Sequence, residues 1–433
     1  MPYFPGVAAG RLHKGRAAVR PGCILLVSQQ EVIDLPVVPA AFIVVEAAPF
    51  SHTMIGLLGL GVPTVLVNAQ QAARLEEGVE LRVDGSSGMI TTERERQFPS
   101  TEVSQPTAGQ ALLTADGMAV SLRASVRHAA AARDAVRAGA AAIGLVRTEF
   151  LSPGQDRVPG APFYRQAFAD VCEAARPLAV TFRLLDVAAD KVPPWLTGNS
   201  DVGGALGRQG VRLYGLTGVK PIIDAQLEAV GALAETFELG VLIPYLVRYE
   251  ELMHWLTVIR SRLPVPVPVG AMAETPAGVL DITHWLETAD FVAVGCNDLM
   301  QCLFAADRDQ PALRRYLDPY APLLYRFLRQ VAEQAGAHQD RLQLCGLLSQ
   351  LQGVLPVLLG LGYRVFSVDA PFIPHLAKTV ERVTVAQCEA LAEQVCRARR
   401  TREVLEILGL PVDRHSPYWG SDAETDAGPR DPR

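Results

Sequence analysis

Residues 291–298 read Phe-Val-Ala-Val-Gly-Cys-Asn-Asp, an apolar run that ends abruptly in two polar side chains. Comparable runs recur after residue 112, separated by helical stretches such as His128–Ala138 and Leu227–Phe237. The eight strand-like runs are Ala119–Ala124, Ala142–Arg147, Ala179–Asp186, Val241–Tyr245, Val269–Glu274, Phe291–Asn297, Leu342–Leu347 and Val365–Val368. Eight strand–helix units in about 280 residues predict an α/β fold, a (β/α)₈ TIM barrel.

Polar side chains stand at the carboxyl ends of five of these runs. They are Arg147, Arg183 with Asp186, Glu274, Asn297 with Asp298, and Cys345. A single case would be a stray charge at a strand end. Five together predict an active site, because barrels of this kind place their chemistry at the carboxyl ends of the strands.

The residue types indicate a ligand class. Well-spaced arginines bind the oxygens of a phosphate ester in forked pairs, and the candidates are Arg147, Arg183 and Arg308. Glu274 and Asp298 suit Mg²⁺, which takes one or two protein carboxylates and fills its other positions with water or substrate oxygens. Cys345 is a nucleophile, an acid or a small packed side chain. These residues predict a Mg²⁺-assisted site for a small phosphorylated anion.

The chain before the barrel has a different residue pattern. Residues 1–97 carry short β-branched runs and a helix candidate that begins near His52 with Ser51 as its cap, which predicts a small β-rich domain. The polar residues 98–111 are expected to be a linker, residues 112–412 the barrel, and residues 413–433 a disordered tail.

Composition excludes several classes of protein. The 433 residues include 40 basic and 46 acidic side chains, a net charge of −6 that argues against a nucleic-acid binder. No apolar stretch reaches about 18 residues, so membrane insertion is not expected. The seven cysteines are scattered and the N-terminus has no signal-peptide pattern, so we expect a cytoplasmic protein with reduced thiols.

Several of these segments closely resemble the phosphoenolpyruvate-utilising family, which includes enzyme I of the bacterial sugar phosphotransferase system, pyruvate phosphate dikinase and phosphoenolpyruvate synthase. The barrel segments are 144–151 (GLVRTEFL), 182–191 (FRLLDVAADK), 272–277 (MAETPA), 294–301 (VGCNDLMQ), 306–308 (ADR), 344–346 (LCG) and 366–370 (FSVDA). In the small domain, residues 49–55 (PFSHTMI) and 61–65 (GVPTV) resemble the family's phosphohistidine segment.

The resemblance implies a set of substrate ligands. Arg147, Arg183 and Arg308 would hold the phosphate of phosphoenolpyruvate. Asn297 would hydrogen-bond the phosphoryl group, and Lys191 would add positive charge nearby.

It also implies the catalytic groups. Glu274 and Asp298 would bind Mg²⁺, and Cys345 would protonate enolpyruvate to release pyruvate. His52 would accept the phosphoryl group, and the small domain would then swivel toward an acceptor. The resemblance therefore implies a phosphoenolpyruvate-dependent phosphotransferase that works through a phosphohistidine.

The chain departs from the family pattern mainly around the histidine. Residues 47–50 (AAPF) stand where the family has Gly-Gly-Arg-Thr, and Leu58 stands where it has an arginine. In the barrel, Gln209 replaces an arginine, Leu347 replaces a glutamate, and residues 186–190 (DVAAD) replace Asp-x-Gly-Gly-Asp. The proposed metal ligands, the three arginines and the cysteine are all retained.

Partners follow from what the sequence lacks. Too few residues precede His52 for a phosphocarrier-docking domain, and no Gly-rich nucleotide-grasp domain is present. The second phosphoryl transfer is therefore expected to involve a separate phosphoacceptor protein or nucleotide-binding subunit. Analogy with the family suggests a homodimer.

Four functions stay open at this point. The leading one is phosphoryl transfer from phosphoenolpyruvate to His52 and on to a partner. The others are half of a split dikinase or synthase, a weakened sensor of phosphoenolpyruvate or pyruvate, and a Mg²⁺-dependent enzyme for C–C bond chemistry on a 2-oxo acid.

Overall fold

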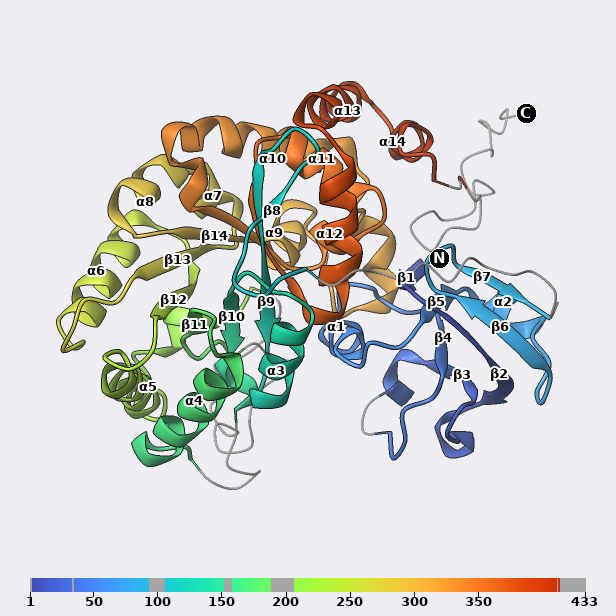
Figure 1. Ribbon diagram of the computed structural model, residues 1–433, viewed down its shortest axis with the longest axis horizontal. Coiled ribbons are helices and arrows are strands. Elements are labelled where there is room, and N and C mark those ends of the chain that lie inside the picture. The colour runs from blue at the N-terminus through green and yellow to red at the C-terminus, as the bar shows by residue number, and fades with distance from the viewer. Residues whose placement is uncertain are drawn as a thin grey trace, which may run out of the picture. The chain divides into compact units, whose positions relative to one another are not determined.

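Eight parallel strands close into a barrel in the computed structural model, and other strands form a separate curled sheet (Figure 1). The structure describes residues 2–32, 35–92, 106–151, 158–187, 206–410 and 412. The chain forms two compact units. The first comprises residues 1–102, 304–322 and 398–433, and the second comprises residues 103–303 and 323–397.

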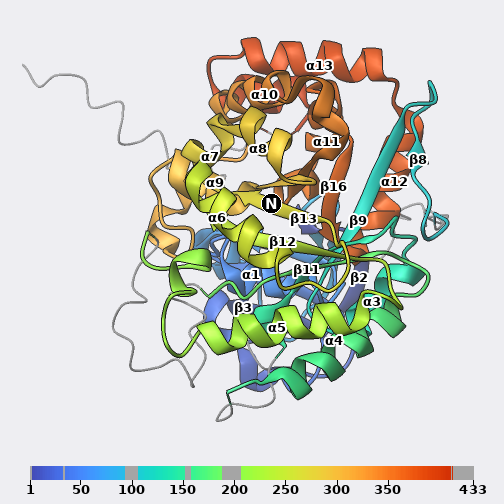
Figure 2. The ribbon, with the colours of Figure 1, turned by 90° about the vertical axis from the view of Figure 1, so that its left-hand side faces the viewer.

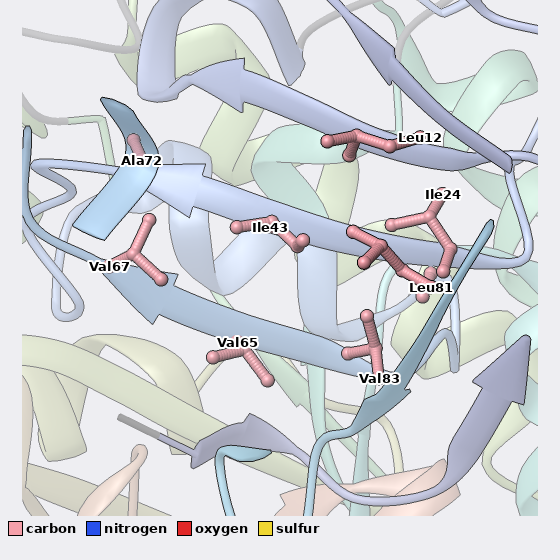
Figure 3. Close-up of a cluster of buried hydrophobic side chains, with 9 residues drawn as sticks. Leu12, Ile24, Ile43, Val65, Val67, Ala72, Leu81 and Val83 are labelled. Carbon is pink, nitrogen blue, oxygen red and sulfur yellow. The ribbon is translucent and has the colours of Figure 1, made fainter. Parts of the chain in front are cut away.

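The first unit is built on a seven-stranded sheet in the order β1-β5-β4-β3-β2-β6-β7. Strands β2 to β5 run parallel, and β1, β6 and β7 join them antiparallel. The strands are β1 (Pro2–Phe4), β2 (Val7–Lys14), β3 (Ile24–Ser28), β4 (Ala41–Val45), β5 (Thr64–Val67), β6 (Glu80–Asp84) and β7 (Met89–Thr91). Apolar side chains from five of these strands and from α2 pack into one core, which includes Leu12, Ile43 and Val83 (Figure 3).

Three helices belong to this unit: α1 (His52–Leu58), α2 (Ala69–Ala73) and α14 (Thr401–Ile407). The Ser51 Oγ accepts a hydrogen bond from the backbone N–H of Met54 at 3.3 Å, so Ser51 caps α1 as predicted. Residues 304–322 are tied into the unit through side chains. Glu46 forms an ion pair with Arg314, and Asp318 accepts a hydrogen bond from the Thr401 hydroxyl.

The second unit is the barrel. Its strands follow the order β9 to β16, every neighbouring pair is parallel, and β10 pairs with β9 to close the ring. The strands are β9 (Ala119–Val126), β10 (Ile143–Arg147), β11 (Val180–Arg183), β12 (Leu239–Leu246), β13 (Val269–Ala273), β14 (Val292–Gly295), β15 (Leu342–Cys345) and β16 (Val365–Asp369). The short strand β8 (Leu112–Leu113) pairs antiparallel with β9. The predicted TIM barrel after a β-rich domain is thus confirmed.

Helices surround the ring of strands (Figures 1 and 2). They are α3 (Ala129–Arg137), α4 (Ala161–Ala175), α5 (Lys220–Leu233), α6 (Tyr249–Arg260), α7 (Pro276–Leu280), α8 (Ile282–Thr288), α9 (Cys296–Leu303), α10 (Pro322–Ala335), α11 (Val354–Gly360), α12 (Ile373–Arg382) and α13 (Val385–Arg397). Strands β12 to β16 are buried along their whole length, because the helices cover their outer faces and side chains fill the barrel. Within the described ranges, no helix is long and apolar enough to cross a bilayer.

Candidate active site

The carboxyl ends of the barrel strands bring the predicted polar residues to one rim. Strand β10 ends at Arg147 and β11 ends at Arg183, and the two arginines are register partners in the ladder. Glu274 follows β13 directly, and β15 ends at Cys345. Because parallel strands of a closed barrel finish at the same end, their terminal side chains converge there.

Asn297 and Asp298 reach this rim in a different way from the one predicted. The sequence pattern extended the strand to residue 297, but β14 ends at Gly295 and α9 begins at Cys296. Both residues therefore lie in the first turn of a helix. Strand and helix join here without a loop, so an apolar run alone does not show where the strand ends.

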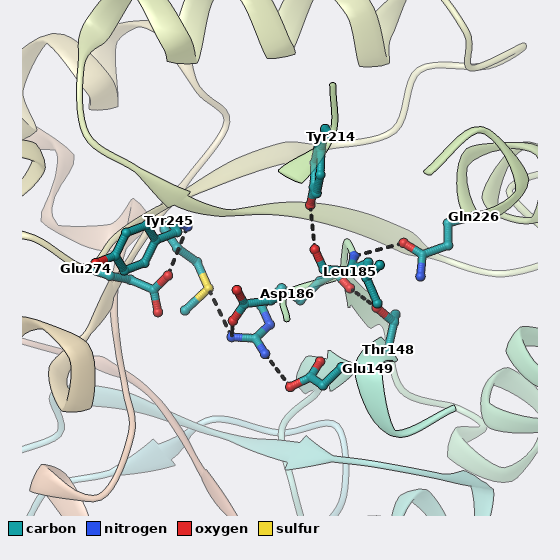
Figure 4. A network of polar contacts seen from close by, with 10 residues as sticks. Thr148, Glu149, Leu185, Asp186, Tyr214, Gln226, Tyr245 and Glu274 are labelled. Atoms are coloured by element: carbon teal, nitrogen blue, oxygen red, sulfur yellow. Dashed lines mark hydrogen bonds and ion pairs between the residues drawn. The ribbon is translucent and has the colours of Figure 1, made fainter. Parts of the chain in front are cut away.

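Arg183 forms the centre of a buried charge network with Glu149 and Asp186, the two acids labelled in Figure 4. Its guanidinium lies 2.5 Å from a carboxylate oxygen of Glu149 and 2.8 Å from one of Asp186, and its side chain is only 7 % exposed. Burial alone would lower the pKa of Arg183, but the carboxylates of Asp186 and Glu149 outweigh it and raise the pKa. Arg183 is therefore a permanent cation held in a fixed position.

Both rim arginines carry a donor that is still available. The Nε atoms of Arg147 and Arg183 are buried and have no hydrogen-bond partner among the described residues. An unmade hydrogen bond at a buried donor costs free energy. An anion at the rim would supply the missing acceptors.

Glu274 is the most perturbed acid of the rim. Its side chain is buried, and its Oε2 accepts a hydrogen bond from the backbone N–H of Tyr245 at 2.9 Å (Figure 4). Burial, together with the negative charges of Asp298 and Asp186, raises the pKa of Glu274 to about 8, against the opposing effect of Arg183. Glu274 lies close enough to Asp298 for the two charges to interact, and neighbouring carboxylates are ligands that a divalent cation takes.

The absence of a side chain at Gly295 leaves room for the side chain of Glu274. A Cβ on Gly295 would lie 2.5 Å from the Cγ and the Oε1 of Glu274, closer than any side chain tolerates. Asn297 is held by a hydrogen bond: its Oδ1 accepts from the backbone N–H of Leu347 at 3.1 Å. Its amide group carries the donors that a phosphoryl oxygen accepts.

Cys345 lies inside the barrel among Leu145, Leu242, Met272 and Ala293. It is 6 % exposed, and its Sγ donates a weak hydrogen bond to the carbonyl oxygen of Val294 at 3.4 Å. Burial, with a smaller effect from Glu274, raises the pKa of Cys345 to about 12. The thiol therefore stays protonated at neutral pH, which makes it a proton donor and a poor nucleophile.

For three predicted residues the assigned role stays a prediction. Arg308 is 5 % exposed and belongs to the first unit, so its role as a phosphate ligand stays a prediction. His52 is the first residue of α1, also in the first unit, and its side chain is outside the described part of the chain. Lys191, the linker residues 98–105 and the tail 413–433 are outside it as well.

Two residues of the network were given no role from the sequence. Glu149 pairs with Arg183, and the Thr148 hydroxyl donates to the Arg183 carbonyl oxygen at 2.8 Å (Figure 4). Their position directly after Arg147 was the available signal. Within the described ranges, no group of three or more His, Cys, Asp or Glu side chains is arranged to hold a metal. A cation here would depend on two carboxylates and on substrate or water oxygens.

Sequence comparison relates this chain to known proteins. A family model described as "PEP-utilising enzyme, PEP-binding domain" matches residues 102–385. The phosphoenolpyruvate-protein phosphotransferase of Streptomyces coelicolor is 32 % identical over 368 residues, which cover 82 % of this chain and 66 % of that protein. The protein of that name from Buchnera aphidicola is 25 % identical over 389 residues, 85 % of this chain and 68 % of the relative.

A longer relative matches as well. The multiphosphoryl transfer protein of Rhodobacter capsulatus is 28 % identical over 408 residues, which cover 90 % of this chain and 49 % of that protein. The chain thus spans between about half and about two thirds of the length of these three relatives.

Proposed function

Because the chain belongs to the family of phosphoenolpyruvate-utilising enzymes, we propose that it transfers the phosphoryl group of phosphoenolpyruvate to His52 and releases pyruvate. The observation that carries the proposal is a buried thiol, Cys345, at the same barrel rim as two arginines and a pair of carboxylates. A nucleophilic site would need an ionised thiol. An enolate, by contrast, needs an acid of this kind.

The arginines would bind and orient the phosphate. Arg147 and Arg183 have buried donors that phosphate oxygens can satisfy, and Arg308, Asn297 and Lys191 would complete the contacts. Glu149 and Asp186 hold the Arg183 guanidinium in place before the substrate arrives. Such preorganised charge stabilises the transferring group at no reorganisation cost.

The donor set at the rim fits Mg²⁺. Glu274 and Asp298 supply hard carboxylate oxygens. Burial first, and then the charge of Asp298, raise the pKa of Glu274, and a divalent cation would favour its ionised form. When held by Glu274 and Asp298, the ion would stabilise negative charge on the substrate.

The reaction then balances as follows. The bond between phosphorus and the enol oxygen breaks as a neutral imidazole nitrogen of His52 bonds to phosphorus. The enolate left behind takes a proton at its methylene carbon from Cys345, which gives pyruvate. The thiolate that remains regains its proton from water. The names of the first two relatives specify a protein as acceptor, so we propose a protein as the next carrier.

The residues around His52 favour a second candidate, a protein that binds phosphoenolpyruvate without turning it over. Ala47, Ala48, Phe50 and Leu58 are buried at 1 to 2 % exposure, and none of them offers a charge to a phosphorylated imidazole. Such a sensor would bind the ligand and release no pyruvate.

Radiolabelled phosphoenolpyruvate separates the two candidates. We expect Mg²⁺-dependent, acid-labile label on the parent chain, none on His52→Ala, and normal labelling of His13→Ala, a matched control in the same domain whose imidazole pairs with Glu77. Equal label on the parent and His52→Ala would show that the assignment of His52 is wrong. Binding without label on any variant would favour the sensor.

A further inference from the structure

Tyr245, near the end of β12, has an unusual backbone conformation. Its φ is +52°, in the left-handed region, and its side chain is 2 % exposed. A bulky residue in this region costs free energy and persists only where its surroundings hold it there. The groups that contact Tyr245 therefore have to account for its left-handed backbone conformation.

The Tyr245 side chain is held by the segment 209–212 and by α9. Its hydroxyl lies next to the amide of Gln209, a residue 6 % exposed, and next to the thiol of Cys302. The guanidinium of Arg212 lies over its ring, 5.2 Å from the centroid. A cation over an aromatic face is attracted to it, so the ring is fixed both at its edge and on its face.

Gly210 allows this close approach. Its own φ is +52°, and a Cβ added to it would lie 2.5 Å from the Cβ of Tyr245. Any larger residue would push the two segments apart. The segment 209–212 is therefore fitted to this tyrosine.

The backbone of Tyr245 contacts Glu274. The Tyr245 N–H donates to the Glu274 Oε2 at 2.9 Å. The direction of an N–H is set by the backbone dihedrals, so the contacts that keep φ at +52° also aim this donor at the carboxylate. A chain of contacts thus runs from Gln209 through Tyr245 to Glu274.

We propose that Gln209 and Cys302 lock the side chain of Tyr245, and that Tyr245 in turn positions Glu274 to bind a divalent cation. The metal role of Glu274 rests on the proposed function, whereas the lock itself does not. Gln209 would act here as a positioning residue. Cys302 would belong to the same lock.

Amide hydrogen exchange tests the lock without metal or substrate. In the metal-free full chain, Tyr245→Phe and Gln209→Leu should speed exchange at the residue-245 amide about fivefold, the factor that one net hydrogen bond supplies. Tyr363→Phe is the matched control, because it removes a buried hydroxyl that donates to the Leu328 carbonyl oxygen at 2.8 Å. It should lower the melting temperature and leave the residue-245 amide unchanged.

Mn²⁺ affinity, measured by electron paramagnetic resonance without substrate, tests the consequence. We expect about fivefold weaker binding in Tyr245→Phe and in Gln209→Leu, and no change in Tyr363→Phe. The double variant should bind no more weakly than Tyr245→Phe, because Gln209 acts through the tyrosine hydroxyl.

The two measurements fail in different ways. Unchanged exchange and unchanged Mn²⁺ affinity in both variants would overturn the proposal. A parent chain that binds no Mn²⁺, with faster exchange in the variants, would overturn the metal role of Glu274 in the proposed function and leave the lock supported.

Discussion

At the scale of single residues, protonation decides what the rim can do. Cys345→Ala keeps the arginines and carboxylates, so we expect it to bind phosphoenolpyruvate with nearly the parent affinity. Pyruvate release should fall about 10²- to 10⁴-fold, the usual contribution of one positioned acid. Cys345→Ser should recover little, because a hydroxyl is a far weaker acid than a thiol. Pyruvate release and ligand affinity are measured on the same preparations.

Cys296 offers a control for this experiment. It is also buried, and its Sγ donates to the same Val294 carbonyl oxygen, at 3.8 Å. Cys296→Ala should therefore release pyruvate at close to the parent rate. Equal rates in the parent and in Cys345→Ala would refute the acid role and leave Cys345 as a packed side chain.

The raised pKa of Glu274 predicts how stability depends on pH. The pKa of this carboxyl is near its usual value of 4.5 in the unfolded chain and about 8 in the fold, so between these values the folded state binds more protons. Stability therefore falls as pH rises through this window, by up to about 1.4 kcal/mol per pH unit from this group.

Urea unfolding of the metal-free protein at pH 6 and pH 8 checks this. Glu274→Gln should lose this part of the pH dependence, whereas Glu228→Gln, an exposed acid that pairs with Arg165, should retain it. The same slope in the parent and in Glu274→Gln would contradict the prediction.

The residue types that sequence reasoning could find are the ones that break an apolar pattern. Arg183, Glu274 and Cys345 follow buried strands and stand out against them. Tyr245 ends an apolar run as an ordinary packed aromatic, and its role depends on a backbone dihedral that the local sequence does not specify. Glu149 acquires its role only when β10 and β11 pair and bring it to Arg183.

At the scale of elements, the join between β14 and α9 positions the acids. Gly295→Ala places a methyl group against the Glu274 side chain, so we expect a loss of about 1–3 kcal/mol in unfolding free energy and weaker phosphoenolpyruvate binding. Gly218→Ala is the matched control, since a Cβ there meets no atom within 4 Å. Chemical denaturation and ligand titration on both variants measure the effect.

A Gly295→Ala chain with parent stability and parent affinity would show that Glu274 has room to move aside. The fixed position of Glu274 would then not depend on the missing side chain at residue 295. In that case the acid would have to be held by its contact with Tyr245 alone.

Elements with an unbroken apolar pattern were predictable. Strand β4 occupies residues 41–45, the range read from the sequence. Strand β2 was not predicted, because Val7–Lys14 has no apolar run and mixes Gly, Arg, His and Lys. It becomes a strand by pairing with β3 and β6, and such tertiary pairing leaves no local pattern.

At the scale of the whole molecule, the proposed chemistry draws on both units. Cys345, Glu274 and Arg183 belong to the barrel unit, whereas His52 and Arg308 belong to the first. The segment 304–322, which carries Arg308, follows α9 in the chain but is compact with the first unit. Its ion pair from Arg314 to Glu46 and its hydrogen bond from Thr401 to Asp318 account for that grouping. These polar contacts join residues far apart in the chain and have no apolar pattern that indicates them, so the sequence alone could not predict them.

Isotope exchange tests the two units together without any acceptor. If phosphorylation of His52 is reversible, the chain alone should move label from pyruvate into phosphoenolpyruvate in the presence of Mg²⁺. His52→Ala should abolish this exchange because it lacks the imidazole that would carry the phosphoryl group. His13→Ala should retain the exchange. Cys345→Ala should slow exchange about 10²- to 10⁴-fold, since the return reaction removes a proton from pyruvate through the same group. Exchange that persists in His52→Ala would show that another residue carries the phosphoryl group. If the parent chain shows no exchange, binding without turnover would be left as the function of the barrel.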